Sequence, residues 1–141
     1  MSKRRALKFL DLWLPVILWA AIIFKLSSGT VPQVSTFFLP NFMFMKSAHV
    51  LFFGALSLLF YRALLGTGLS RKQSAIYAVI LTFFYGGTDE FHQMFTQGRE
   101  ARVRDVFIDG AGAFVFTYFF YWLLPKFPKK IQNFLLELGI K

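Results

Sequence analysis

Four apolar runs alternate with short polar segments along the chain. They are Leu12–Phe24 (13 residues), Ser47–Tyr61 (15), Gln73–Thr88 (16) and Gly110–Leu124 (15), and apart from His49 they contain no Asp, Glu, Lys, Arg or His. Such runs also form buried helices in large soluble proteins, but a chain of 141 residues is too short to bury four of them. The pattern therefore predicts transmembrane helices.

We expect an all-α membrane protein made of one domain over residues 1–141. It is a four-helix transmembrane bundle followed by a C-terminal amphipathic interfacial helix, with spans at about residues 8–27, 44–64, 73–95 and 104–124. Basic residues precede the first run, as in a signal peptide, but no small-residue cleavage site with a polar mature start follows it, so we interpret it as a retained span. Residues 126–141 form the interfacial tail, because Ile131, Phe134, Leu135 and Leu138 recur there at helical spacing.

Composition and charge support this reading. The chain is 56% hydrophobic and 20% aromatic, and its 16% charged residues compare with about 25% in soluble proteins. It has no cysteine, which excludes disulfides and thiolate sites. The net charge of +9 would suit a nucleic-acid-binding protein. With a cytoplasmic N-terminus and four spans, however, the whole +9 lies on the inner side and the outer side is neutral.

This asymmetry is what the positive-inside rule describes, so we expect a multipass cytoplasmic-membrane protein with both termini in the cytoplasm. The basic side suits anionic lipid headgroups, so we expect membrane lipids as partners. We expect no nucleic-acid partner. No Gly-rich phosphate-binding loop is present, so we expect no nucleotide partner.

The outer ends of the spans are unusually polar. The charge-free runs are shorter than the roughly 20 residues that cross a hydrocarbon core, so polar side chains enter the edge of the membrane. Helical spacing puts several of them on shared faces: Lys46 with His49; Asp89 with His92 and Gln93; Asp105 with Asp109 and Gly112; and Lys25, Ser27 and Ser28 at the end of the first span.

We therefore predict an ion-paired polar pocket that opens outward, with Gly86, Gly87, Gly110 and Gly112 allowing the helices to approach closely beside it. Simpler interpretations stay open for single residues. Lys25 and Lys46 also suit interface anchors, and Asp105 also suits an N-cap. Glu100, Arg102 and Arg104 suit a solvated loop, and His49 and His92 suit hydrogen-bonded interior histidines.

The spacing of these residues resembles the VanZ-like family of small bacterial membrane proteins. The motifs are Phe24-x-x-Ser27-Ser28, Lys46-x-x-His49, Asp89-Glu90-x-His92-Gln93-x-Phe95-x-x-x-Arg99 and Asp105-x-x-x-Asp109-Gly110-x-Gly112. The resemblance implies a bacterial cytoplasmic-membrane protein linked to the cell envelope and to low-level resistance to the glycopeptide teicoplanin, without implying a reaction. The family often has Pro where this chain has Gln97, and Asn where it has Asp109.

Our preferred hypothesis is a protein that binds or modifies an anionic lipid-linked cell-envelope component, such as a wall precursor. Lys46 and Arg99 would hold its phosphate. His92 or His49 would act as general base and Asp89 or Glu90 would orient it, which makes these four the candidate catalytic residues if a reaction occurs. The remaining ligand-binding candidates are Gln93, Asp105, Asp109, Ser27 and Ser28.

Three alternatives stay open. In the first, Asp89, His92 and neighbouring carboxylates bind a metal ion; ion pairs account for the same residues, so the preferred hypothesis includes no metal and no cofactor. In the second, the intramembrane acids and histidines serve a proton-coupled lipid transporter. In the third, the protein is a non-catalytic accessory protein whose ion pairs lock the helices together. Whether it is an enzyme is left undecided.

Overall fold

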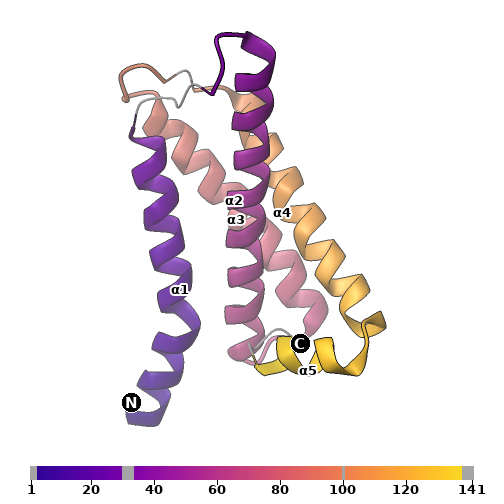
Figure 1. The fold of residues 1–141 in the computed structure, drawn as a ribbon. Helices are drawn as coiled ribbons and strands as arrows, with labels where there is room; N and C mark the ends of the chain where they lie inside the picture. The colour runs from indigo at the N-terminus through magenta and orange to yellow at the C-terminus, as the bar shows by residue number, and fades with distance from the viewer. Residues whose placement is uncertain (1–2, 30–33, 100, 138–141) are drawn as a thin grey trace.

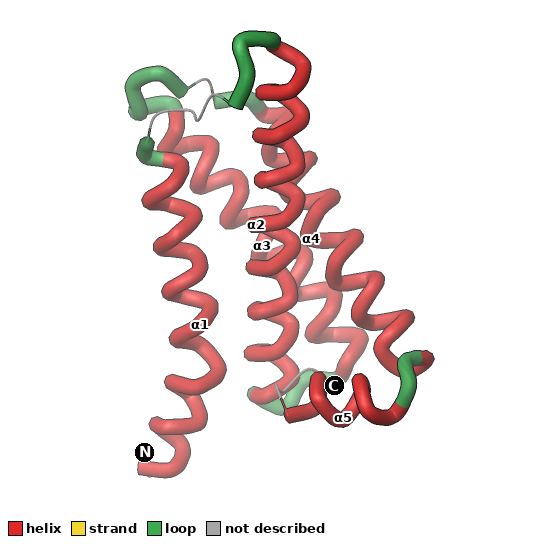
Figure 2. Tube along the Cα trace, viewed as in Figure 1, coloured by secondary structure: helices red, strands yellow, loops and turns green. Residues whose placement is uncertain are grey.

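The structure, a computed structural model, describes residues 3–29, 34–99 and 101–137. These residues form helices α1 (Lys3–Ser27), α2 (Phe38–Gly66), α3 (Arg71–Gln93), α4 (Val103–Leu123) and α5 (Lys129–Glu137), with a short 3₁₀ turn at Leu124–Lys126. The four long helices run side by side, and both termini lie at the same end, which α5 crosses (Figure 1). The connections from α1 to α2 and from α3 to α4 lie at the opposite end, which we call the loop end (Figure 2).

Three helices have the length and composition of a membrane span. The qualifying segments are Arg5–Ser27, Phe38–Gly66 and Val103–Lys126. The prediction of an all-helical fold is therefore confirmed over the described residues, with three membrane-capable helices and one further long helix, α3. A fourth span at α3 and an interfacial position for α5 stay predictions, and residues 138–141 of the predicted tail lie outside the described residues.

α3 differs from the other long helices because its buried face is small and polar. Ser74, Ala78, Thr82 and Gly86 recur every fourth residue and are buried, and the stripe ends in buried Asp89, Glu90 and Gln93. This face packs against α2 and α4. Small residues let helix backbones approach closely, which is a common basis of helix packing in membranes.

Close helix contact is clearest at Gly112 on α4. A Cβ atom built there would lie 2.8 Å from the carbonyl oxygen of Val50 and 2.9 Å from its Cα. Gly86 faces the Asp109 carboxylate in the same way, with Oδ2 at 3.2 Å from the position of a Cβ. Nothing lies within 4 Å of a Cβ at Gly87, so the predicted packing role of Gly87 is wrong.

We predict that Gly112→Ala destabilises the protein by about 1–3 kcal/mol, because the added methyl group would collide with the α2 backbone, which has little freedom to move. The measurement is the thermal unfolding midpoint of the purified protein in detergent. Gly87→Ala is the matched control and should be neutral or slightly stabilising, since alanine favours a helix. Equal midpoints for the two variants would contradict the close contact.

Candidate functional site

The candidate site lies at the loop end, where α1 and α3 end and where α2 and α4 begin (Figure 1). Every candidate residue named from the sequence belongs to this end of the bundle. The side chains fall into two groups, one joining α2 to α4 and one joining α1 to α3.

Two charged contacts join α2 to α4. Lys46 Nζ lies 2.5 Å from Asp105 Oδ1, and one turn further into the bundle His49 Nδ1 lies 2.8 Å from Asp109 Oδ1. Asp109 is fully buried and the Asp105 side chain is 10% exposed. α2 and α4 run in the same direction, so Lys46 and His49, one turn apart on α2, face Asp105 and Asp109, one turn apart on α4.

The imidazole of His49 is held on two sides. Its Nδ1 faces the Asp109 carboxylate, and its ring stacks on Phe53 with 5.9 Å between centroids. When Nδ1–H donates to the carboxylate, Nε2 is left as the proton acceptor. This arrangement, a histidine oriented by a buried acid, is the one that general-base catalysis uses.

The second group joins α1 to α3 around Asp89, which is 3% exposed. Its Oδ1 accepts a hydrogen bond from the Ser27 hydroxyl at 2.6 Å, and its Oδ2 accepts one from Gln93 Nε2 at 2.8 Å. One turn further along α3, His92 Nε2 lies 2.9 Å from Ser28 Oγ. The Asp89 carboxylate thus has both oxygens occupied and ties the end of α1 to α3.

Arg99 and Glu90 each serve the end of a neighbouring helix. The Arg99 guanidinium donates to the carbonyl oxygens of Leu26 at 2.7 Å and Gly29 at 2.9 Å, at the C-terminal end of α1. Glu90 Oε2 accepts from the backbone N–H of Arg102, the residue before α4, at 2.7 Å. Both contacts put a charge where the helix dipole favours it. The other oxygen of Glu90 is buried without a hydrogen-bond partner among the described residues.

A cavity of about 220 Å³, which we call the polar-end cavity, opens between α1, α2 and the end of α3. Five candidate residues line it: Ser27, His49, Asp89, Gln93 and Arg99. The remaining candidates lie beside it and hold its walls. These are Ser28, Lys46, Glu90, His92, Asp105 and Asp109.

Sequence reasoning missed the apolar part of this lining. It consists of Ile23 and Leu26 on α1 and of Phe44, Met45, Ala48, Phe52 and Phe53 on α2. A signal was present, because Phe44, Ala48 and Phe52 are spaced i, i+4, i+8 and Met45 and Phe53 flank His49 at i−4 and i+4. The cavity is therefore mainly apolar, with polar side chains contributed by α1, α2 and the end of α3.

The metal hypothesis has no matching geometry among the residues that the structure describes. They contain no group of three or more His, Asp or Glu side chains placed to hold a metal ion. The carboxylates are instead distributed over separate hydrogen bonds and ion pairs.

A comparison with models of known families matches the VanZ/LLP1 family over residues 8–124. The chain belongs to the VanZ/LLP1 family. The match confirms the resemblance drawn from the motifs, and together with the apolar helices it indicates that this VanZ/LLP1 chain is a membrane protein. Comparisons with curated proteins and with solved structures gave no match.

We predict that Lys46 and Asp105 are energetically coupled by about 0.5–3 kcal/mol, as expected for contacting, poorly solvated charges. The measurement is a double-mutant cycle on unfolding stability with Lys46→Met and Asp105→Asn. The control cycle uses Asp11 and Arg62, whose side chains are 2.9 Å apart but include an Asp11 that is 68% exposed. That exposed pair should couple by less than about 1 kcal/mol. A larger coupling energy for Asp11 and Arg62 than for Lys46 and Asp105 would contradict this prediction.

Proposed function

We propose that this VanZ/LLP1 protein binds an anionic, lipid-linked cell-envelope component in the polar-end cavity, at the outer face of the bacterial cytoplasmic membrane. The observation that carries the proposal is the cavity itself: its lining is mainly apolar and includes the polar side chains of His49, Asp89 and Arg99. Arg99 donates to α1 through Nε and Nη2, and its remaining N–H groups would bind a phosphate at the polar side of the cavity. The lipid chain would lie along the apolar side.

A proton-transfer role for His49 extends this proposal. The contact of its Nδ1 with buried Asp109 supports an imidazole whose Nε2 accepts a proton from a bound hydroxyl or water. His92 is the second candidate base, although its Nε2 already lies beside Ser28. In both cases Asp89 would hold Ser27 and Gln93 in place, and Glu90 would hold the start of α4. A link to teicoplanin resistance would follow if the bound component is a wall precursor.

The alternative is an accessory protein whose polar residues only lock the helices. Its support is that the charged groups at the loop end have partners: Lys46 with Asp105, His49 with Asp109, Glu90 with a backbone N–H, and Arg99 with α1 carbonyls. Lipid transport has weaker support, because Asp11 is the one carboxylate among the described side chains in the half of the bundle away from the loop end, and it is exposed.

We predict that Ala48→Phe reduces binding of a polyprenyl phosphate by at least about tenfold, because the added ring occupies a cavity of about 220 Å³ while every charged residue is kept. Binding is measured on purified protein in detergent, with the uncharged polyprenol as the comparison ligand. Ala111→Phe on the exposed face of α4 is the matched control and should bind as the wild type does.

In cells, the cavity variants distinguish a role in ligand binding from a role that only holds the helices together. A host that expresses the wild type should become less susceptible to teicoplanin. Ala48→Phe, His49→Gln and Arg99→Ala should abolish this effect at unchanged membrane abundance. Equal binding of the phosphate and the alcohol, or full binding by Ala48→Phe, would contradict the cavity proposal. Loss of stability in every variant without a selective loss of binding would favour the accessory role.

The orientation is tested by single cysteines, which the natural chain lacks. We predict that a membrane-impermeant maleimide labels Gln97→Cys in intact protoplasts, because the loop end faces outward. It should label Lys129→Cys only after permeabilisation, because basic flanks stay in the cytoplasm. Both positions are exposed, so reactivity is matched. Labelling of Lys129→Cys in intact protoplasts would contradict the proposed orientation.

A further inference from the structure

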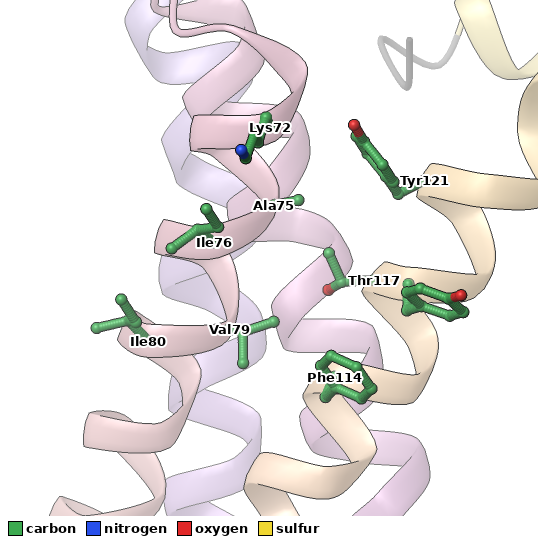
Figure 3. A pocket seen from close by; sticks show the side chains of 9 residues that line it. Lys72, Ala75, Ile76, Val79, Ile80, Phe114, Thr117 and Tyr121 are labelled. Atoms are coloured by element: carbon green, nitrogen blue, oxygen red, sulfur yellow. The ribbon is translucent and has the colours of Figure 1, made fainter.

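A larger cavity lies at the other end of the bundle, between α3 and α4. It encloses about 390 Å³. Figure 3 shows Ala75, Ile76, Val79 and Ile80 of α3 on one side and Phe114, Thr117 and Tyr121 of α4 on the other, with Lys72 at the end of the α3 row. We call it the α3–α4 groove. It shares no lining residue with the polar-end cavity.

The floor of the α3–α4 groove is apolar although it contains a threonine. Thr117 is 2% exposed, and its hydroxyl lies 2.6 Å from the hydroxyl of Ser57 on α2. That hydrogen bond satisfies the only polar group of the Thr117 side chain, so the groove offers an occupant no polar partner along its floor. Ile76, Ile80 and Phe114 form the rims and are 49%, 42% and 56% exposed.

One end of the groove is basic. Lys72 is exposed and has no ion-pair partner among the described residues. The guanidinium of Arg71 lies 5.3 Å from the centre of the Tyr121 ring, which lines the groove, and donates to the Tyr121 carbonyl oxygen at 3.1 Å. In the sequence, α3 has no carboxylate before Asp89 and α4 has none after Asp109, both of which belong to the loop end. The groove therefore joins an apolar trough to a positive charge that no carboxylate of α3 or α4 at this end opposes.

The dimensions favour a narrow occupant. From Lys72 to Ile80 the groove follows about 12 Å of helix axis, close to the roughly 15 Å depth of hydrocarbon in one leaflet. The groove holds about 390 Å³ and its lining is mainly apolar, which suits a single hydrocarbon chain lying along it.

We propose that the α3–α4 groove binds one acyl chain of an anionic phospholipid, with the phosphate beside Lys72 and Arg71. The apolar trough and the charge at its end correspond to the two parts of such a lipid. The phosphate gains most at a membrane surface from a lysine without a competing carboxylate. This lipid site is separate from the proposed ligand site at the loop end and does not depend on it.

The test is native mass spectrometry of the purified full-length protein, titrated with phosphatidylglycerol or with phosphatidylcholine of identical acyl chains. We expect the wild type to retain one phosphatidylglycerol more tightly than phosphatidylcholine. Lys72→Ala should reduce the ratio of phosphatidylglycerol affinity to phosphatidylcholine affinity by about fivefold, because one lysine near a membrane surface contributes about 1 kcal/mol to the binding of an anionic lipid. Lys129→Ala, exposed at the same end of the bundle but outside the groove, should leave it unchanged.

A second pair of variants tests the trough. Val79→Trp should fill it and remove the retained lipid of either headgroup. Val115→Trp, the same substitution at a residue that is 56% exposed and outside the lining, should retain it. If Val79→Trp fails to fold, Ile80→Trp at the rim replaces it with the same expected loss.

Two results would overturn the proposal. One is equal retention of the two lipids by the wild type. The other is wild-type retention by the groove-filling variant; if that variant also changed from dimer to monomer, the groove would be a contact between two copies of the chain.

Discussion

A carboxylate buried among apolar helices needs a partner, because an unpaired charge in such surroundings is strongly unfavourable. Asp109 is fully buried, and His49 is its partner at 2.8 Å. This contact sets the register of α2 relative to α4. The contact of Lys46 with Asp105 imposes the same register one turn closer to the loops. A slip by one turn, about 5.4 Å, would break both contacts at once. Gly112 and Gly86 supply the room that this register needs, because the α2 backbone and the Asp109 carboxylate occupy the space of their missing side chains.

α1 is held differently. It packs mainly against α2 and only slightly against α3. The half of α1 nearer the loop end makes polar contacts with α3 and the residues after it: Ser27 with Asp89, Tyr85 with the Ala20 carbonyl at 2.6 Å, and Arg99 with the Leu26 carbonyl. The polar-end cavity lies between α1 and the rest of the bundle. The residues proposed to meet a ligand are therefore also the residues that hold one wall of its cavity, so binding and the position of α1 are physically linked.

The two ends of the bundle differ in their acids. At the loop end, the buried carboxylates of Asp89, Asp105 and Asp109 are held by partners on a neighbouring helix, whereas the described acid in the other half, Asp11, is 68% exposed. At the other end, the basic side chains of α3 and of the segment after α4 contact aromatic rings, as Arg71 does with Tyr121 and Lys126 does with Trp122 at 5.0 Å. This contrast is why a polar ligand is proposed for one cavity and a lipid chain for the other.

Hydropathy and a period of 3.6 residues are local properties, so the sequence was enough to predict the helical class, the polar end of the bundle and the shared helix faces of Lys46 with His49 and of Asp105 with Asp109. It did not determine the partners. Asp89 was expected to orient a histidine but binds Ser27 and Gln93, and Arg99 was expected to face a ligand but first caps α1. Nor did the sequence separate Gly112, which touches Val50, from Gly87, which touches nothing. These outcomes depend on the rotation and register of whole helices. The buried polar pairs and the packing along the helices set that rotation and register together, and both join residues that are far apart in the sequence.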